Sequence, residues 1–328
     1  MNQAIDAISK SMIPGAYLVE VLPALRHLPK SLSWWEWEAK RVFNELNLQY
    51  EKLFLKIKHQ VAKGYEQSPS FSASLAESQA SHHLTDQECA WLSGVLYNAG
   101  FETTATTLLW FIAAMVSFPE CQQHAHEELD QVVGCARPPS FEDLEHLPYI
   151  QAIVKEVLRW RPALPLSVPH IATEDHYYHD FFIPKGAICI PNILAMNHDP
   201  ETYGENANEF FPNRYLDEEG NLKDPQSEGH FTYGFGQRIC VGRRVANNTL
   251  FIQIATLLWA VQMEAPNDGS GNPLKLDLSK LEDPSGVFMR PKPFDIVCKP
   301  RFPDAEILLQ QTKEEIMEEI HAHRESLA

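Results

Sequence analysis

The sequence has few basic residues for its length. Its 328 residues include 27 Lys and Arg against 44 Asp and Glu, which gives a formal net charge of −17. A protein that binds nucleic acid needs a basic surface for the phosphates. This charge balance therefore argues against nucleic acid as a partner.

Cysteine is sparse and scattered. The six cysteines lie at positions 89, 121, 135, 189, 240 and 298, and none forms a Cys-X-X-Cys pair. This spacing excludes a dense disulfide framework and favours a reducing compartment. Most free cysteines are buried and inert, so a reactive one has to be recognised from its surroundings.

The chain also lacks a long apolar run. Its first residues are polar, unlike those of a secretory signal. The most apolar stretch, residues 105–118, is shorter than the roughly 20 residues that a helix needs to cross a bilayer. We expect this stretch to be a buried helix, and we expect the chain as given, without an anchor, to be soluble or intracellular.

The hydrophobic patterns predict a mainly α protein with small β-sheets, because no alternation of strands and helices is present. Thr85 and Glu88 form a capping box, which predicts a long helix that runs to about Phe118. We expect further helices over residues 36–63, 119–133, 149–160, 243–261 and from 305 onward.

The rest of the chain is expected to be irregular or to form short strands. Residues 64–84, rich in Ser, Gln and His, predict a loop. After residue 162 prolines become frequent, and residues 181–190 predict a hairpin that turns at Pro184-Lys-Gly. A last β region is expected over residues 286–300.

A glycine-rich loop over residues 233–242 carries the most informative cysteine. It is not a dinucleotide fingerprint, because Ile239 stands where a third glycine belongs, and no Lys-Ser/Thr follows as in a phosphate loop. Gly234 and Gly236 allow the backbone to approach a flat ligand closely. The loop therefore predicts a site for a ligand other than a nucleotide.

Cys240 is expected at the start of a helix, where free N–H groups stabilise a thiolate. Arg238, two residues earlier, is placed to pair with an anionic group of the same ligand.

The long helix carries a second motif, Ala99-Gly-Phe-Glu-Thr-Thr104. At 100° per residue Glu102 falls on an apolar face, where a carboxylate is costly unless it is paired or used. Thr103 falls on a second, hydroxylated face. The alternative interpretation is a helix kinked at Gly100, with threonine hydroxyls bonded back to carbonyl groups.

A third motif is the pair Glu156 and Arg159, spaced i,i+3 on a helix. Such pairs are common on helix surfaces. Here Glu156 falls on the apolar arc between Tyr149 and Ala152, so it needs a buried partner such as Arg159.

These motifs, in this order, resemble those of the cytochrome P450 family. Residues 233–242 resemble its heme-binding signature, residues 99–104 its oxygen-activation motif, and residues 156–159 its Glu-X-X-Arg motif. Residues 210–215 resemble the segment that supplies a second arginine, here Arg214. Within the signature this sequence departs from the commonest family pattern at three positions, which are Tyr233, Gln237 and Val241.

The resemblance implies heme b (iron protoporphyrin IX) as the cofactor, with Cys240 as the axial thiolate and metal ligand. His170 and Arg238 would contact the heme propionates, and the signature residues Tyr233 and Gly236 would belong to the cofactor site. The loss of a positive charge at Gln237 affects the face where the family docks its electron donor.

The resemblance also implies roles for the other motifs. Thr103 and Glu102 would organise proton delivery to bound dioxygen. Glu156, Arg159 and Arg214 would form a structural ion network that supports the cysteine loop. The residues expected to line the substrate side, or else simply to pack in the core, are Phe101, Leu164, Leu166, Val287 and Phe288.

By this resemblance the chain is one domain over residues 1–328, truncated at its N-terminus, with the C-terminal part of the cytochrome P450 fold. Its expected parts are distal-side helices (1–84), the long helix to the Glu-X-X-Arg helix (85–161), small sheets with the cysteine loop (162–300), and a charged tail (301–328).

The implied function is that of a monooxygenase that inserts one oxygen atom of O2 into an apolar organic substrate, similar to fungal enzymes of secondary metabolism. Electrons would come from NADPH–cytochrome P450 reductase. The full-length family lies on the cytosolic face of the endoplasmic reticulum membrane through an N-terminal anchor, which we expect to be absent from this chain.

Two alternatives stay open. A truncated remnant without catalysis could act as a decoy or interaction protein, and heme occupancy separates it from an enzyme. A heme–thiolate enzyme could instead catalyse dehydration or rearrangement, and oxygen consumption with a reductase separates that reaction from oxygenation.

Overall fold

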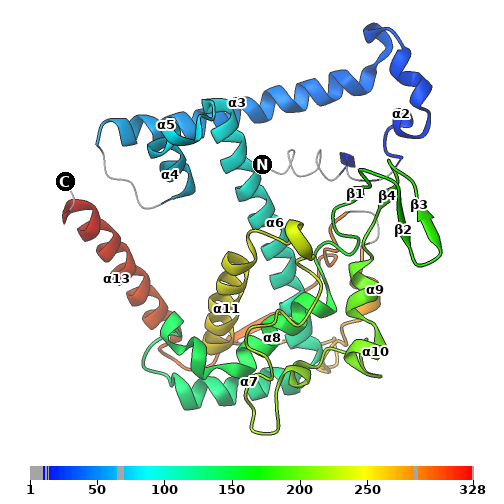
Figure 1. The fold of residues 1–328 in the computed structure, drawn as a ribbon. Helices are drawn as coiled ribbons and strands as arrows, with labels where there is room; N and C mark the ends of the chain where they lie inside the picture. The colour runs from blue at the N-terminus through cyan, green and yellow to red at the C-terminus, as the bar shows by residue number, and fades with distance from the viewer. Residues whose placement is uncertain (1–9, 12, 14, 65–69, 284–286, 327–328) are drawn as a thin grey trace. The chain divides into compact units, whose positions relative to one another are not determined.

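The structure is a computed structural model of the chain, and it describes residues 10–11, 13, 15–64, 70–283 and 287–326 (Figure 1). It divides into two compact units, the first comprising Met1–Glu102 with Gln310–Ala328 and the second Thr103–Leu309. The boundary at Glu102 falls inside the long helix α6 (Asp86–Ser117), and each unit is described by itself.

In the first unit, the long helix α3 packs beside short helices. The elements before α6 are α2 (Leu18–Val21), η1 (Pro23–His27), η2 (Lys30–Leu32), α3 (Trp34–Ala62), α4 (Phe71–Glu77) and α5 (Gln79–His82). Phe54 of α3, Leu75 of α4 and Cys89 of α6 form a small hydrophobic core. Asn47 of α3 accepts hydrogen bonds from the side chains of Gln87 (2.7 Å) and Trp91 (2.8 Å) of α6.

The predicted start of α6 is confirmed, whereas the predicted loop before it is wrong. The amide of Glu88 donates to Thr85 Oγ1 (3.2 Å), and the amide of Thr85 donates to Glu88 Oε2 (2.8 Å), which is a capping box. Residues 71–82 form α4 and α5, because Ser70 caps α4 and Leu75 buries its side chain against α3. Tertiary burial thus stabilises helices in a polar segment. Residues 65–69 of the predicted loop lie outside the described residues.

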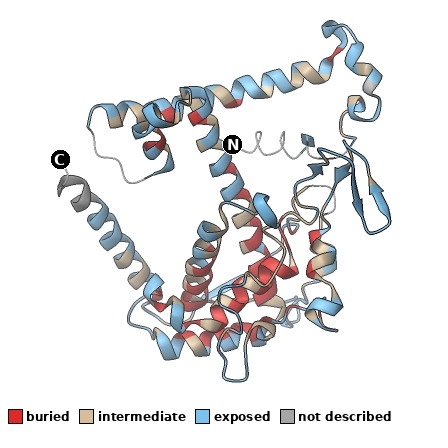
Figure 2. Ribbon diagram, in the orientation of Figure 1, coloured by how far each residue is buried: buried red, intermediate tan, exposed pale blue. Residues whose placement is uncertain are grey.

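The second unit contains the larger core. Its further helices are α7 (Pro119–Val132), η3 (Phe141–His146), α8 (Pro148–Trp160), α9 (Ile193–Asn197), α10 (Pro200–Tyr203), η4 (Pro212–Tyr215), η5 (Gly236–Arg238), α11 (Arg243–Ala260), α12 (Leu278–Leu281) and α13 (Ala305–Ser326), which runs on into the first unit. Figure 2 shows buried residues concentrated on α6, α7, α8 and α11. Ten of the 13 residues of α8 are buried, so this helix is the centre of the unit.

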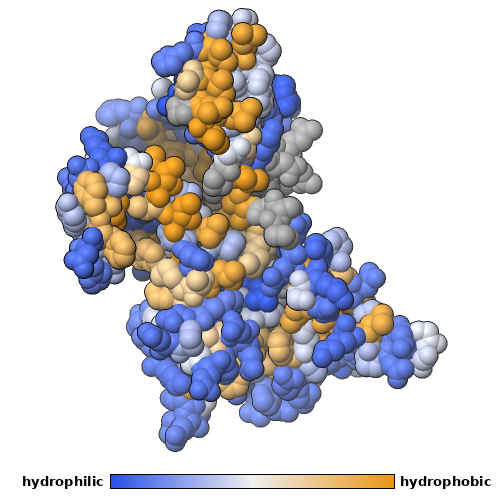
Figure 3. Space-filling model, turned by 90° about the vertical axis from the view of Figure 1, so that its right-hand side faces the viewer, coloured by the Kyte–Doolittle hydropathy of each residue, from blue (hydrophilic) through white to orange (hydrophobic). Residues whose placement is uncertain are grey.

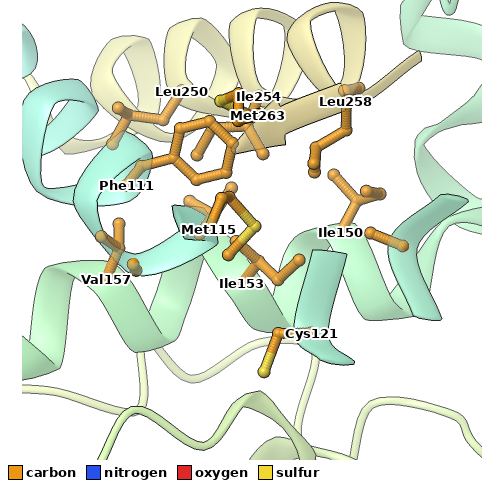
Figure 4. Packing of buried hydrophobic residues seen from close by; sticks show 14 of the residues in the cluster. Phe111, Met115, Cys121, Ile150, Ile153, Val157, Leu250, Ile254, Leu258 and Met263 are labelled. Carbon is orange, nitrogen blue, oxygen red and sulfur yellow. The ribbon is translucent and has the colours of Figure 1, made fainter. Parts of the chain in front are cut away.

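The core of the second unit brings together segments far apart in the sequence. In the close view, Phe111 of α6, Ile153 of α8 and Ile254 of α11 point toward one another (Figure 4). The predicted helices over 119–133, 149–160 and 243–261 are therefore confirmed to within a few residues. Helices α7 and α11 each bury one face, whereas α8 is buried on most of its surface.

Among the described residues, α6 is the one helix long and apolar enough to cross a membrane by length and composition. The core helix of a soluble protein passes the same test. Trp110, Phe111 and Met115 of α6 are fully buried within the second unit. The prediction of a buried helix over residues 105–118 is thus confirmed.

Among the described residues, three two-stranded antiparallel sheets complete the second unit. They pair β1 (His170–Ile171) with β4 (Ile188–Cys189), β2 (His176–Tyr178) with β3 (Phe181–Ile183), and β5 (Val261–Glu264) with β6 (Val297–Pro300). Helices with small sheets are the fold class that the sequence predicted. The predicted β region over 286–300 is reduced to β6, and its residue 286 lies outside the described residues.

The predicted hairpin over residues 181–190 is wrong in its pairing. The turn is present, since the amide of Ala187 donates to Pro184 O (3.0 Å) and Gly186 has a φ of +87°. The strands on its two sides do not pair with each other, however. The amide of Lys185 donates to Asp175 (2.7 Å) and that of Gly186 to Ala172 O (2.8 Å), so the turn is bonded to the preceding segment and β2–β3 is nested inside β1–β4.

Candidate functional site

The cysteine loop leads directly into α11, as predicted. The amide of Cys240 donates to Tyr233 O (2.8 Å), which closes the loop, and α11 begins three residues later at Arg243. Cys240 is exposed. The thiol therefore lies just before the first turn of α11.

Gly234 and Gly236 shape the loop. Their φ angles are +69° and +66°, in the left-handed region that favours glycine. No atom other than those of the adjacent residues lies within 4 Å of the position that a Cβ would take at either glycine. The loop therefore turns sharply and leaves open space beside its backbone.

Tyr233 anchors the loop to α11 through its hydroxyl group. This hydroxyl donates to Asn247 Oδ1 (2.6 Å), and the Asn247 amide donates to Glu228 Oε2 (2.8 Å). Burial, together with the negative charges of Glu228 and Cys240, raises the pKa of Tyr233. The tyrosine thus gives this loop a hydrogen bond that a phenylalanine would not supply. Its contact with a cofactor stays a prediction.

Glu156, Arg159 and Arg214 meet in the interior, as the sequence predicted. Glu156 and Arg159 are 0% exposed. Arg159 Nε and Nη2 donate to the two Glu156 oxygens at 2.7 and 2.8 Å, and Arg214 Nε lies 3.1 Å from Glu156 Oε2. The amide of Phe211 also donates to Glu156 Oε1 (2.7 Å). The carboxylate is therefore fully paired, as a buried charge must be.

Arg159 uses all five of its N–H groups. Besides the two bonds to Glu156, its Nη atoms donate to Asn197 O (2.7 Å), Ala207 O (2.7 Å) and Glu209 O (2.9 Å). One guanidinium thus fixes three backbone positions that come 38 to 50 residues later in the chain.

Asn197 connects this network to the cysteine loop. Its side chain accepts from the amide of Phe231 (2.8 Å) and donates to Thr232 Oγ1 (3.0 Å). The Thr232 hydroxyl donates in turn to Leu158 O of α8 (2.6 Å). The sequence did not single out Asn197 and Thr232, because their partners lie more than 30 residues away and no local pattern marks them.

On α6 the structure supports part of the alternative interpretation. The Thr107 hydroxyl donates to Thr103 O (2.9 Å), which is a bond back to the helix carbonyl. Thr103 itself is half-buried and belongs to the second unit. Glu102 is 5% exposed and belongs to the first unit, as does Phe101, whose ring stacks on Tyr97.

Two of the predicted substrate-side segments lie side by side in the second unit. The amide of Met289 donates to Ala163 O (2.9 Å), so the segment with Val287 and Phe288 is joined to the segment that continues into Leu164 and Leu166. Leu164, Val287 and Phe288 are half-buried, and Leu166 is exposed.

No hydrogen bond among the described residues joins His170 to Arg238, the two residues predicted to contact the heme propionates. His170 lies in β1 and Arg238 ends η5, and both side chains are exposed. Their role toward a cofactor stays a prediction.

The loop has the features that heme requires. A flat apolar ring with an axial thiolate needs a free thiol, open space beside it, and apolar contacts. Cys240 and the two open glycines supply the first two. Phe235, Val241 and Val245, in the loop and the first turn of α11, are 51%, 81% and 71% exposed, so apolar side chains are available for contact with a ligand. The space-filling view shows exposed hydrophobic residues on the face that it presents (Figure 3).

The comparisons with known proteins identify the family. The cytochrome P450 family model matches residues 1–297, and the chain therefore belongs to the cytochrome P450 family. It is 45% identical to a cytochrome P450 monooxygenase of Armillaria gallica, over 96% of this chain and 61% of that protein.

Other relatives show the same partial coverage. A cytochrome P450 monooxygenase of Postia placenta, number 58, is 42% identical over 90% of this chain and 56% of its own length. The monooxygenase iboC of Amanita muscaria is 36% identical over 94% of this chain and 63% of its own length. The chain thus spans about three fifths of the length of the curated relatives that it matches.

The first prediction concerns the buried ion network. Glu156→Gln removes the negative charge and leaves Arg159 and Arg214 buried without it, which should lower the free energy of unfolding by about 3–5 kcal/mol. Urea denaturation measures this loss. The control is Glu45→Gln, which breaks the exposed pair with Arg41 and should cost below about 1 kcal/mol. Equal losses in the two variants would contradict the structural role of Glu156.

The second prediction concerns acid stability. Burial, with the charges of Arg159 and Arg161, lowers the pKa of His198 from the ordinary 6.5 to about 4. The unfolded chain therefore binds a proton between pH 6.5 and 4 that the folded chain does not, so stability falls as the pH falls through this range. His198→Gln should reduce this loss by ~2 kcal/mol. Urea denaturation at pH 7 and 4.5 measures it, and an unchanged acid loss in the variant would refute the assignment.

Proposed function

We propose that this chain forms the thiolate side of a heme monooxygenase, with Cys240 as the axial ligand of heme b. The observation that carries the proposal is the exposed Cys240 thiol at the start of α11, in a loop that a buried ion network supports. Family membership adds the cofactor, because a cysteine thiolate is the axial ligand in this family.

Heme, when bound, supplies the activation of O2, and an anionic sulfur ligand favours cleavage of the O–O bond. The protein supplies position and charge. Asn197 holds Phe231 and Thr232 just before the loop, and Asn247 holds Tyr233 at its start, so the entry to the loop is fixed relative to α11. Arg238 and His170 would bind the propionates as cationic and hydrogen-bonding groups.

We assign proton delivery to Thr103 and Glu102. The Thr103 carbonyl accepts a hydrogen bond from the Thr107 hydroxyl, which holds the Thr103 backbone in α6. The Thr103 Oγ1 hydroxyl would hold the proton for transfer. Glu102, a nearly buried carboxylate on the same helix, would replenish that proton.

The partners follow from the family and from the side chains. Electrons would come from NADPH–cytochrome P450 reductase at the endoplasmic reticulum membrane. The substrate would be an apolar organic molecule of secondary metabolism, because the residues assigned to the substrate side are Phe101, Leu164, Leu166, Val287 and Phe288. One oxygen atom of O2 would enter the substrate and the other would leave as water.

The third prediction tests the ligand. The reduced, carbon monoxide-bound absorption spectrum of the chain with added heme should show a thiolate-type Soret band. Cys240→Ala should abolish this band, because no sulfur then reaches the iron. Cys189→Ala, another exposed cysteine, is the matched control and should keep it. Absence of the band in the parent chain, or its survival in Cys240→Ala, would overturn the proposal.

The fourth prediction tests Thr103. Thr103→Ala should keep the thiolate-type band and lower product formation per NADPH consumed at least about tenfold, since a lost proton donor typically costs 10²- to 10⁴-fold in rate. Thr104→Ala changes the neighbouring threonine, which lies about 100° around the helix, and should have a small effect. If both variants form product as the parent does, Thr103 has no such role.

A further inference from the structure

Trp110 joins α6 to the segment after α12. The Trp110 indole is 0% exposed, and its Nε1 donates to Met289 O at 2.6 Å. The amide of Met289 donates to Ala163 O at 2.9 Å. Both polar groups of the Met289 backbone are thus used, one toward α6 and one toward the segment after α8.

Arg161 reinforces the same junction. Its guanidinium lies over the rings of Trp160 (4.2 Å to the centroid) and Trp110 (5.3 Å), and its Nη2 lies 3.0 Å from Glu282 Oε1. The Arg161 side chain is 13% exposed, so this charge is largely removed from water. A cation that lies over two indole rings and is also paired with a carboxylate is restricted in its position.

Glu282 lies at the base of a loop that contains the predicted substrate-side residues. An antiparallel bridge joins Glu282 to Pro291, and the amide of Lys292 donates to Leu281 O (2.7 Å). These contacts close the loop that carries Val287 and Phe288. The described part of this loop is therefore held at its base by the bridge and at Met289 by two hydrogen bonds.

The hydrogen bond from Trp110 to Met289 O also fixes the face of α6 that carries Thr103. Trp110 follows Thr103 by seven residues, which is about two helical turns and brings both onto one face. The bond from Trp110 to Met289 thus sets the position of that face relative to the loop.

We propose that Trp110 and Arg161 are positioning residues that hold the Val287–Phe288 loop against α6 and against the segment Ala163–Leu166. As a consequence, the two residues set the site of oxidation on the substrate without touching it. This consequence rests on the proposed function. Trp110 is buried and Arg161 faces indoles and Glu282, so each acts through Met289 or Glu282.

The fifth prediction tests the contact by hydrogen exchange on the chain. Trp110→Phe keeps an aromatic ring and removes the indole donor, which leaves Met289 O without that partner. Amide exchange in residues 287–290 should become at least about tenfold faster, since a lost buried hydrogen bond loosens the segment locally.

Trp259→Phe is the matched control. Trp259 is also 0% exposed and donates Nε1 to a backbone carbonyl, Gly134 O, at 2.7 Å. This variant should leave exchange in residues 287–290 unchanged. Unchanged exchange in Trp110→Phe, or the same increase in both variants, would overturn the proposal.

A milder variant keeps the test decisive if Trp110→Phe fails to fold. Glu282→Gln removes only the charge that pairs with Arg161 and should raise exchange over residues 281–292 severalfold. Glu264→Gln breaks the pair with Lys299 at similar exposure and should not. No difference between these two variants would contradict the role of Arg161.

The effect on the site of oxidation is measured in a separate experiment. In enzyme that shows the thiolate-type band, Trp110→Phe should change the ratio of positional isomers of the product while the band stays the same. Faster exchange with an unchanged ratio would overturn the role in selectivity. Failure of the proposed function is recognised independently, because it removes the band from the parent chain and leaves the exchange measurement intact.

Discussion

Glu156, Arg159 and Arg214 place three charges in the interior of the second unit, and the rest of that unit is arranged around them. Removing such charges from water costs several kcal/mol per ion, and this cost is offset only when every donor and acceptor is paired. Arg159 meets this condition with five bonds, three of them to backbone carbonyls. Segments that follow α8 by 38 to 50 residues are therefore fixed by one side chain.

The last turn of α8 positions both sides of the candidate site. Leu158 O accepts from Thr232 and so fixes the approach to the cysteine loop. Arg161 and Ala163, just beyond the helix, hold the loop that carries Met289. Because Leu158 lies in the last turn of α8 and Arg161 and Ala163 follow that turn directly, a displacement of α8 would move the cysteine loop and the Met289 segment together.

The sequence predicted the elements that are specified by interactions between residues close together in the chain. The capping box of Thr85 and Glu88 satisfies free amide groups of the first turn of α6 by itself, so its start was predictable. The pair Glu156 and Arg159 was predictable because helical spacing places the carboxylate on an apolar arc. The wrong predictions concern elements that are stabilised by contacts with other parts of the chain. Helix α4 depends on packing against α3, and the partner of β3 depends on bonds from the turn at Lys185 to Asp175.

The sequence by itself determined which functional groups the chain carries and on which helices they lie: a cysteine before a helix, a threonine on α6, and an acid–base pair on α8. Their order and spacing identified the family resemblance, because residue type and helical period are properties of the local chain. Only the tertiary structure decided how these groups are held. Asn197, Thr232 and Trp110 act through hydrogen bonds to backbone groups 34 to 179 residues away, and nothing in a local pattern encodes such a partner.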